Sequence, residues 1–348
     1  MGGAIVSKSP KRSRPLVSRR STLALGAAAA GALAFPSILR AQSKTLRYGH
    51  NNEVASVAGA QADWFATAVG EHSGGDLAVQ VFPNSQLGKL QELAQAVSLG
   101  TVAISHNTAG ALGSLYAPFA ALDTPYLYRD VDHLMKVMDV SSPVMSELNK
   151  GLIDAANIRV LYAHYFGARN LTCDRPIKSP ADLSGVKIRA VPFPIYTTAV
   201  EGLGAVPIPV DWSEVPTALA TGVVAGQENP VNVILSVKLY EVQSHLMLTR
   251  HMSNAEVVVM NEDEWQALSD KQKQAVQAAA ADTRIRATKA IQDNEASETE
   301  ELKKRGMTVI GPDDGLEIDA FRTSVSALVK ERFGDQYGAL YEKIRAIS

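Results

Sequence analysis

The sequence predicts an α/β protein of two lobes, with one long helix that spans both. The chain has 348 residues and 46% hydrophobic content, which is enough for two cores of ordinary size, whereas one core of this length would be unusual. Strand-like and helix-like patterns alternate along it, as is typical of a parallel sheet covered by helices. A helical pattern without Gly or Pro runs from the capping pair Ser269 and Gln272 to Arg305, about 54 Å at 1.5 Å per residue. That length exceeds one small domain.

Polar side chains follow the predicted strands of the first half of the chain. His50 and Asn51 stand at the end of the first strand, and His106 and Asn107 stand at the end of the third. In α/β folds ligands bind beyond the carboxyl ends of the strands, so we expect these four side chains near a binding site. The elements expected here are strands at 46–50, 77–82 and 101–107 and helices at 57–72 and 89–99.

A second cycle of strands and helices begins after Gly167, where we place the boundary between the lobes. The apolar strand 256–261 is expected to return to the first lobe. The predicted lobes are lobe I, residues 43–166 and 253–290, and lobe II, residues 167–252 and 291–348. The other expected elements are loop and strand at 118–130, helices at 130–149, 321–333 and 337–347, a helix after Ser213 that contains Val223, and strands at 158–166 and 307–310.

The N-terminus, residues 1–42, has the pattern of an export signal. It contains seven of the 34 basic residues and no acid, then an Ala/Gly/Leu run up to Pro36 and small residues near Ala41. The segment SRRSTLALG, with Arg19 and Arg20, resembles a twin-arginine signal; an ordinary secretory signal and an uncleaved anchor are the alternatives. The run is short for a hydrocarbon layer of about 30 Å, so we expect cleavage and a mature protein free in the periplasm.

Composition disfavours several classes of function. Beyond residue 41 the chain carries 27 basic and 36 acidic residues, a net charge of −9 without a basic patch, which argues against nucleic-acid binding. Cys173 is the single cysteine, so no thiolate metal site can form, and the seven histidines lack metal-ligand spacing. No nucleotide-binding or hydrolase motif occurs, and we expect no metal, no cofactor and no enzyme activity. An active site assembled from distant residues, with His50 or His106 as a base, is the alternative.

Two arginines form the central feature of the sequence. Arg169 ends the segment YAHYFGAR and Arg189 ends GVKIR, and Asn229 lies in the polar turn GQENP. A guanidinium is permanently charged and offers five donors in a rigid fork, so two of them at the ends of separate apolar strands predict a carboxylate receptor. A structural ion pair or a surface position is the common alternative for any one arginine. The nearest acids to Arg189, Asp182 and Glu201, are not at pairing distance on the same strand.

Six segments in order along nearly the whole mature chain carry a resemblance to a known family. The chain resembles the solute-binding proteins of tripartite ATP-independent periplasmic (TRAP) transporters. The segments are FPNSQLGKLQEL (82–93), GARNLT (167–172), DLSGVKIRAV (182–191), LGAVPIPVDWSEV (203–215), GVVAGQENP (222–230) and YEVQSHLMLTRH (240–251).

The resemblance implies a two-lobed periplasmic-binding-protein fold with a hinge. It implies that Arg189 binds the ligand carboxylate bidentately, that Arg169 is a second contact, and that Asn229 faces the same carboxylate. Trp212 corresponds to a residue that lines the pocket, and Asn51 and Asn107 match pocket positions less closely. Where many relatives carry Tyr after SEV, this chain has Pro216.

The expected function is to capture a small organic acid and to deliver it to the integral-membrane permease subunits of a TRAP transporter. We expect the protein to be a monomer. Contacts from His50, Asn51, His106 and Asn107 to the distal end of the ligand would favour a closed state and hydroxyl recognition, hence a uronate or an aldonate. A C4-dicarboxylate would require a second cation, and none is evident at 46–57 or 101–115. The alternative ligands are a C4-dicarboxylate and a 2-oxo acid. The alternative functions are those of a sensory binding protein and of an exported enzyme.

Overall fold

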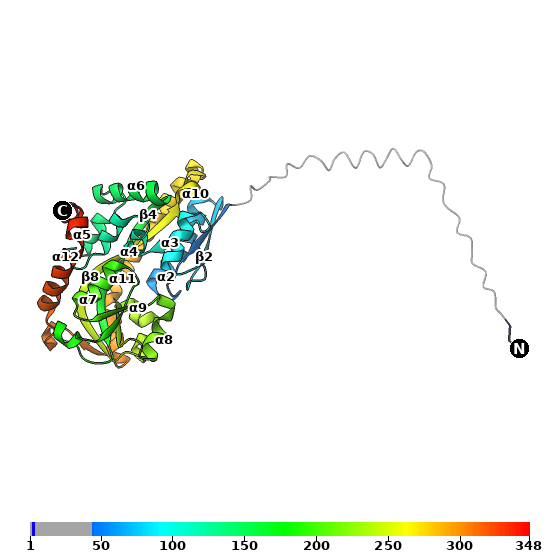
Figure 1. Ribbon diagram of the computed structural model, residues 1–348. Coiled ribbons are helices and arrows are strands. Elements are labelled where there is room, and N and C mark those ends of the chain that lie inside the picture. The colour runs from blue at the N-terminus through cyan, green and yellow to red at the C-terminus, as the bar shows by residue number, and fades with distance from the viewer. Residues whose placement is uncertain (1, 4–43) are drawn as a thin grey trace, which may run out of the picture. The chain divides into compact units, whose positions relative to one another are not determined.

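The structure is a computed structural model that describes residues 2–3 and 44–348 (Figure 1). The predicted export signal, with Arg19 and Arg20, therefore lies outside the described residues except for residues 2–3. Within the described ranges, no helix combines the length and the apolar character that crossing a membrane requires.

Nine strands form one mixed sheet in the order β2-β1-β3-β8-β4-β7-β5-β6, with β9 beside β8. Parallel pairs stand toward both edges, because β1 pairs with β2 and β3, and β5 pairs with β6 and β7. Antiparallel pairing of β4 with β8 and β7 joins the two parallel parts. The strands are β1 (Lys44–Gly49), β2 (Leu77–Phe82), β3 (Ile104–Asn107), β4 (Ile158–Cys173), β5 (Lys187–Ala190), β6 (Val206–Pro209), β7 (Gly226–Pro230), β8 (His245–Asn261) and β9 (Thr308–Ile310).

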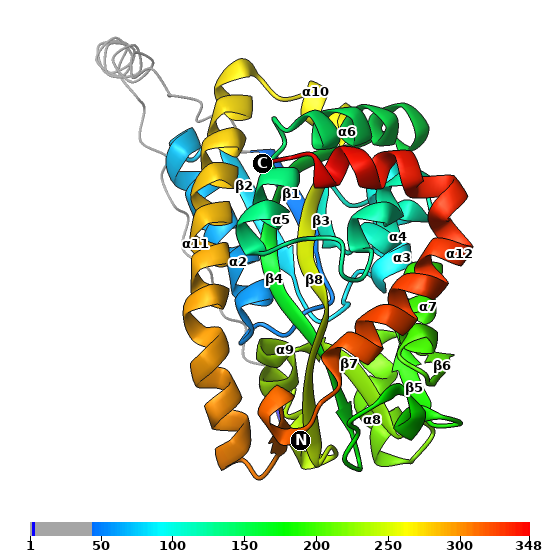
Figure 2. The ribbon, with the colours of Figure 1, turned by 90° about the vertical axis from the view of Figure 1, so that its left-hand side faces the viewer.

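The strands β4 and β8 are much longer than predicted, and they run through both parallel parts of the sheet (Figure 2). The ladder between them shifts register at three places, one of which lies between Tyr165 and Gly167. Gly167 has φ +127°, and a Cβ there would lie 2.6 Å from the Cβ of Pro230, so only glycine fits. The irregular ladder at Gly167 coincides with the predicted boundary between lobes.

The long helix is confirmed as α11 (Asp270–Lys304), which begins at the predicted capping box of Ser269 with Gln272. It packs along α2 (Val57–Ser73), β4 and α9 (Val231–Ser236), and so contacts elements of both lobes (Figure 2). The remaining helices are α3 (Leu90–Ser98), α4 (Ala109–Gly113), α5 (Val131–Val137), α6 (Pro143–Ala156), α7 (Pro194–Gly202), α8 (Val215–Ala220), α10 (Glu262–Gln266) and α12 (Ile318–Arg345), and the 3-10 helices are η1 (Ala117–Asp123), η2 (Pro180–Leu183), η3 (Trp212–Glu214), η4 (Leu239–Glu241) and η5 (Pro312–Asp314).

Three predicted elements were wrong. The segment 118–130, predicted as loop and strand, begins within the 3-10 helix η1 and continues as a loop without a strand. The helix at 130–149 is two helices, because Ser142 caps α6 and Pro143 occupies its first turn. The terminal pair is the single helix α12, which accommodates Gly334 without a break, since a glycine inside a helix costs only about 1 kcal/mol and the packing of the flanking turns offsets it.

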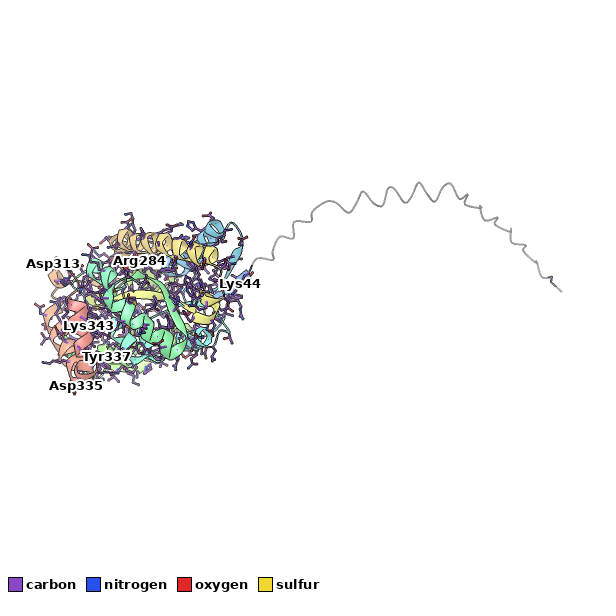
Figure 3. All side chains as sticks on the ribbon, turned by 90° about the horizontal axis from the view of Figure 1, so that it is seen from above. Lys44, Arg284, Asp313, Asp335, Tyr337 and Lys343 are labelled. Atoms are coloured by element: carbon purple, nitrogen blue, oxygen red, sulfur yellow. The ribbon has the colours of Figure 1, made fainter. Side chains whose placement is uncertain are left out.

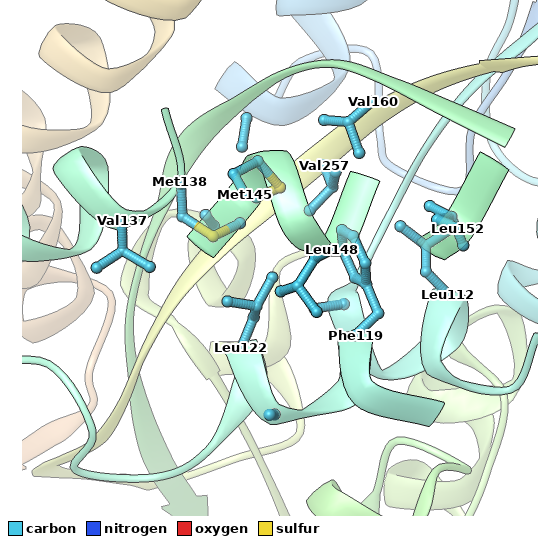
Figure 4. Close-up of a cluster of buried hydrophobic side chains, with 14 of the residues drawn as sticks. Leu112, Phe119, Leu122, Val137, Met138, Met145, Leu148, Leu152, Val160 and Val257 are labelled. Carbon is cyan, nitrogen blue, oxygen red and sulfur yellow. The ribbon is translucent and has the colours of Figure 1, made fainter. Parts of the chain in front are cut away.

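Helix α12 packs against two hydrophobic cores. Phe321 and Val325 join the core that contains Leu171 and Ile188 of lobe II. Tyr337, Tyr341 and Ile344 join the core built around Phe119, Leu148 and Val257 of lobe I, part of which Figure 4 shows. Lys343 of the same helix is labelled in Figure 3. Its Nζ lies 2.6 Å from Oε2 of Glu147 of α6. The lobe ranges stay a prediction, and this packing favours moving the end of α12 from lobe II to lobe I.

Candidate functional site

A cavity lies between loops at the strand ends of lobe I and the strands β5 and β7 of lobe II. It holds about 500 Å³ of space free of protein atoms, including space open to solvent. We call two sets of its lining residues the lobe I wall (Asn51, Asn52, Ser56, Thr108, Glu256) and the lobe II wall (Arg189, Val191, Trp212, Asn229, Val233). Phe166 and Arg169 of β4 line it between the two walls.

Arg189 is a buried cation without a carboxylate partner in the described part of the chain. It ends β5 and is 2% exposed. Its Nε donates to the carbonyl oxygen of Val210 at 2.9 Å, and its guanidinium lies 5.7 Å from the ring centre of Trp212. Burial lowers the pKa of Arg189 to about 10 although the charge of Glu228 opposes it. The group therefore stays charged at neutral pH and lines the cavity without an ion-pair partner among the described residues.

Arg169 differs, because it is held by Glu228 of β7. The Nε and Nη2 groups of Arg169 donate to the two carboxylate oxygens of Glu228, and Nη2 also donates to the Glu228 carbonyl at 2.6 Å. Burial would raise the pKa of Glu228, but the charge of Arg169 and a hydrogen bond from His251 lower it to about 2. The structural ion pair that the sequence left open is therefore present at Arg169, and fewer of its donors are free for a ligand.

Three more predicted residues line the cavity. Asn229 is buried and donates through Nδ2 to Oε1 of Gln227 at 2.5 Å, and Trp212 covers Arg189. Asn51 contributes a buried Oδ1 that has no hydrogen-bond partner among residues 44–348. Five of the eight predicted residues thus surround one cavity; their contact with a ligand remains a prediction.

His50, His106 and Asn107 require a correction, because the structure places them behind the cavity lining. All three are buried, and the rings of His50 and His106 stack with centres 4.6 Å apart. Asn107 donates to Oγ of Ser105 at 2.8 Å. Burial lowers the pKa of His50 to about 4 and that of His106 well below its ordinary value, so both rings are neutral. They support the lobe I wall instead of reaching into the cavity.

Sequence reasoning missed Glu256, which the structure brings into the lobe I wall. Glu256 lies on β8 directly opposite His164 of β4 and is 3% exposed. Burial raises its pKa to about 8. The available signal was an acidic residue at the start of the apolar segment EVVVMN, since a buried strand seldom contains an unpaired carboxyl group.

An ion-pair cluster crosses from one lobe to the other beside the cavity. The Nζ of Lys89, which precedes α3, lies 2.7 Å from Asp211 and 3.0 Å from Glu214. Lys89 and Asp211 also line a smaller adjoining cavity together with Arg189 and Trp212. The two lobes are therefore linked by charge at the edge of the site.

Comparison with known proteins places the chain in a family. Residues 48–336 match the family described as bacterial extracellular solute-binding protein, family 7. A solute-binding protein of Roseobacter denitrificans is 35% identical over 298 residues, which cover 84% of this chain and 89% of that protein.

Solved structures agree with this match. The same Roseobacter protein, a TRAP periplasmic solute-binding protein with bound L-galactonate, has a TM-score of 0.81 at 30% identity and covers 88% of this chain and 99% of its own. A TRAP solute-binding protein of Polaromonas sp. JS666 with bound D-erythronate has a TM-score of 0.81 at 32% identity, covering 88% and 98%. The predicted two-lobed fold, the TRAP resemblance, the periplasmic location and the non-enzymatic class are confirmed. The chain belongs to family 7 of the bacterial extracellular solute-binding proteins, the family of TRAP solute-binding proteins.

Proposed function

We propose that this protein captures a hydroxylated monocarboxylate, an aldonate or a uronate, and delivers it to the membrane subunits of a TRAP transporter. The observation that carries the proposal is Arg189, a buried guanidinium that faces the cavity and has no carboxylate partner in residues 44–348. A buried charge is costly unless it is paired, so an anionic ligand is the natural complement.

The arrangement around Arg189 suits a carboxylate. Its Nη groups make no hydrogen bond within the described residues, so they are available for a bidentate pair, and charge-assisted bonds of this kind are about twice as strong as neutral ones. Asn229 adds an amide from the neighbouring strand β7, and Trp212 shields the pair from water. Because the rest of the ligand would contact the lobe I wall, only the closed arrangement makes both sets of contacts, and binding favours closure.

Two observations favour a sugar acid over a dicarboxylate. The relatives solved with L-galactonate and D-erythronate bind monocarboxylates that carry hydroxyl groups. The lobe I wall contributes amide, hydroxyl and carboxyl groups and no cation. Lys89, the nearby lobe I cation, is already neutralised by Asp211 and Glu214.

A thermal-shift screen tests the proposal, with the mature protein against aldonates, uronates, C4-dicarboxylates and 2-oxo acids. We expect stabilisation by aldonates or uronates, followed by calorimetric dissociation constants for the best of them. Stabilisation by dicarboxylates or 2-oxo acids alone would refute the sugar-acid assignment, and no stabilisation by any acid would refute carboxylate binding. Mass spectrometry of the incubated ligand, which should remain unchanged, separates a receptor from an enzyme, and uptake reconstituted with the permease subunits separates transport from sensing.

A further inference from the structure

The lobe I wall is centred on a buried carboxyl group with one unsatisfied oxygen. Oε1 of Glu256 accepts a hydrogen bond from Nδ2 of Asn52 at 3.1 Å. Oε2 of Glu256 has no hydrogen-bond partner in the described residues, although Glu256 lines the cavity and is almost completely buried. Buried polar atoms are seldom left without a partner, so a ligand group in the cavity that Glu256 lines is a candidate partner for this carboxyl group.

The hydrogen bonds of His164 determine what its ring presents to Glu256. Nδ1 of His164 lies 3.0 Å from the carbonyl oxygen of Tyr165, and a carbonyl can only accept. Nδ1 therefore carries the proton. Burial lowers the pKa of His164 to about 4, so the ring is neutral and its Nε2 is an acceptor, 3.8 Å from Oε2 of Glu256.

His106 presents the opposite tautomer. Tyr162 donates to Oε1 of Gln61 at 2.6 Å, which orients the amide so that Nε2 of Gln61 donates to Nδ1 of His106 at 2.9 Å. Nδ1 of this neutral ring is then an acceptor and Nε2 carries the proton, 3.4 Å from Oε2 of Glu256. Both distances to Oε2 exceed a good hydrogen bond, so Oε2 lies between a donor and an acceptor without being satisfied by either.

The charge state of Glu256 follows from its surroundings. Burial raises the pKa of this carboxyl to about 8, while the hydrogen bond from Asn52 and the charge of Arg169 lower it and the charge of Asp123 raises it. The nearby rings of His50, His106 and His164 are neutral and provide no compensating charge. At neutral pH Glu256 is therefore mainly a carboxylic acid, which can donate one hydrogen bond and accept another.

We propose that Glu256 is the specificity-determining residue of the lobe I wall: it binds an alcohol group of the ligand and excludes a second carboxylate. The inference rests on the proposed function and specifies its ligand class. An alcohol both donates and accepts, and so complements the carboxylic acid. A second carboxylate would find no cation in this wall, and the single O–H that Glu256 can donate would not offset the cost of burying its charge.

Two matched sets of acids test the proposal by calorimetry at pH 7. The six-carbon set is L-galactonate, 2-hydroxyhexanoate, which lacks the distal hydroxyls, and galactarate, which has a carboxylate in place of the terminal alcohol. The four-carbon set is D-erythronate, 2-hydroxybutyrate and meso-tartrate, which differ in the same way. The variants are Glu256→Leu, which removes the polar group, and Glu256→Gln, which keeps a donor and an acceptor.

For the wild-type protein we expect the aldonate of at least one set to bind about 10-fold or more tighter than both of its analogues, since one buried hydrogen bond contributes about 1–3 kcal/mol when its partner is lost. Glu256→Leu should weaken aldonate binding by about 10-fold or more and change binding of the deoxygenated acid by less than about threefold. Glu256→Gln should retain the preference. Thermal unfolding of each variant checks that it folds.

Glu71→Leu is the matched control, because Glu71 is an exposed acid on α2 outside the cavity, and its substitution should alter no affinity. The proposal is overturned if Glu256→Leu affects the aldonate and the deoxygenated acid equally, or if wild-type protein binds galactarate or tartrate as tightly as the aldonates. If wild-type protein binds none of the six acids, the proposed role of Glu256 fails; if the uronates of the thermal-shift screen do not bind either, the proposed function fails as well.

Discussion

The two walls of the cavity are both buried and polar, yet they differ in charge. The lobe II wall presents Arg189, a cation whose charge no described residue neutralises. The lobe I wall presents Glu256, a carboxyl group that burial keeps largely protonated, together with the amide of Asn52. A permanently charged guanidinium attracts any carboxylate. A neutral carboxyl group, which donates one hydrogen bond and accepts another, favours ligands that carry a matching alcohol group. Under the proposed function, the lobe II wall would therefore provide affinity and the lobe I wall would provide selectivity.

Arg169 lies between the two walls and shows how an ion pair changes the role of a buried arginine. It is as deeply buried as Arg189, but its guanidinium is held by Glu228 and lies 5.2 Å from the ring centre of Tyr196. A paired buried arginine contributes mainly to the folded structure, and an unpaired one is available to a ligand. Substitution of each arginine separates these two roles.

The largest expected effect is on stability, for Arg169→Met. This change leaves Glu228 buried without its main partner and should lower the free energy of unfolding by about 3–5 kcal/mol. Urea unfolding measures it. The double variant Arg169→Met/Glu228→Leu, which removes both charges, should recover part of the loss. A single variant as stable as wild type would show that the ion pair is not structural.

Arg189→Met should have the complementary effect. It should weaken binding of the best sugar acid at least about 100-fold, equivalent to about 2.7 kcal/mol, because the ligand carboxylate is left buried without its cation. Its free energy of unfolding should change by less than about 1 kcal/mol, because the described residues provide no ion-pair partner that the change would leave uncompensated. Calorimetry gives the affinity. Arg175→Met, at a side chain 57% exposed, is the control. A loss under 10-fold would contradict the role of Arg189.

Much of the fold could be predicted from the sequence, because the sequence patterns that determine it involve neighbouring residues. The Ser269 capping box, the uninterrupted run to Lys304 and the glycine at 167 each determine a helix end or a bend through neighbouring residues. The boundaries of β4 and β8 could not be predicted in this way. Their length depends on pairing across the whole sheet, between residues far apart in the sequence such as Ile158 and Asn261, which are 103 positions apart.

The sequence predicted the cation of the lobe II wall, but of the lobe I wall it predicted Asn51 and missed Glu256. Arg189 and Asn229 stand in recognisable segments, and both line the cavity. The partner of Arg169 was adjacent to Asn229 in the sequence, but only the antiparallel pairing of β4 with β7 brings Glu228 to it. Glu256 was missed because its burial and protonation arise from packing between β3, β4 and β8, and no local pattern encodes that packing.

The protonation of Glu256 predicts a pH dependence of stability. Its pKa of about 8 in the folded protein lies above the ordinary value of 4.5, so its contribution is fully present below pH 4.5 and is lost as the pH rises through 8. The free energy of unfolding of wild type relative to Glu256→Gln should therefore fall by at least about 1.4 kcal/mol, the equivalent of one unit, between pH 5 and pH 8. Groups common to both proteins that do not interact with Glu256 cancel in this difference. An unchanged difference over the same range would mean that Glu256 is already ionised in the folded protein at pH 5.

The smallest expected effect concerns the link between the walls at the edge of the cavity. Lys89 can reach Asp211 and Glu214 only when the lobes are close together, so Lys89→Met should destabilise the closed state and weaken sugar-acid binding by about two- to fivefold at low salt. Salt screens exposed charges, so this difference should vanish near 1 M salt, where the screening length is about 3 Å. The control is Lys271→Met, which removes an exposed ion pair with Asp76 within predicted lobe I. If both lysine variants bind the sugar acid with the same affinity at low salt, the ion pairs of Lys89 do not contribute to closure. Contacts with the ligand alone would then bring the lobe I wall and the lobe II wall together.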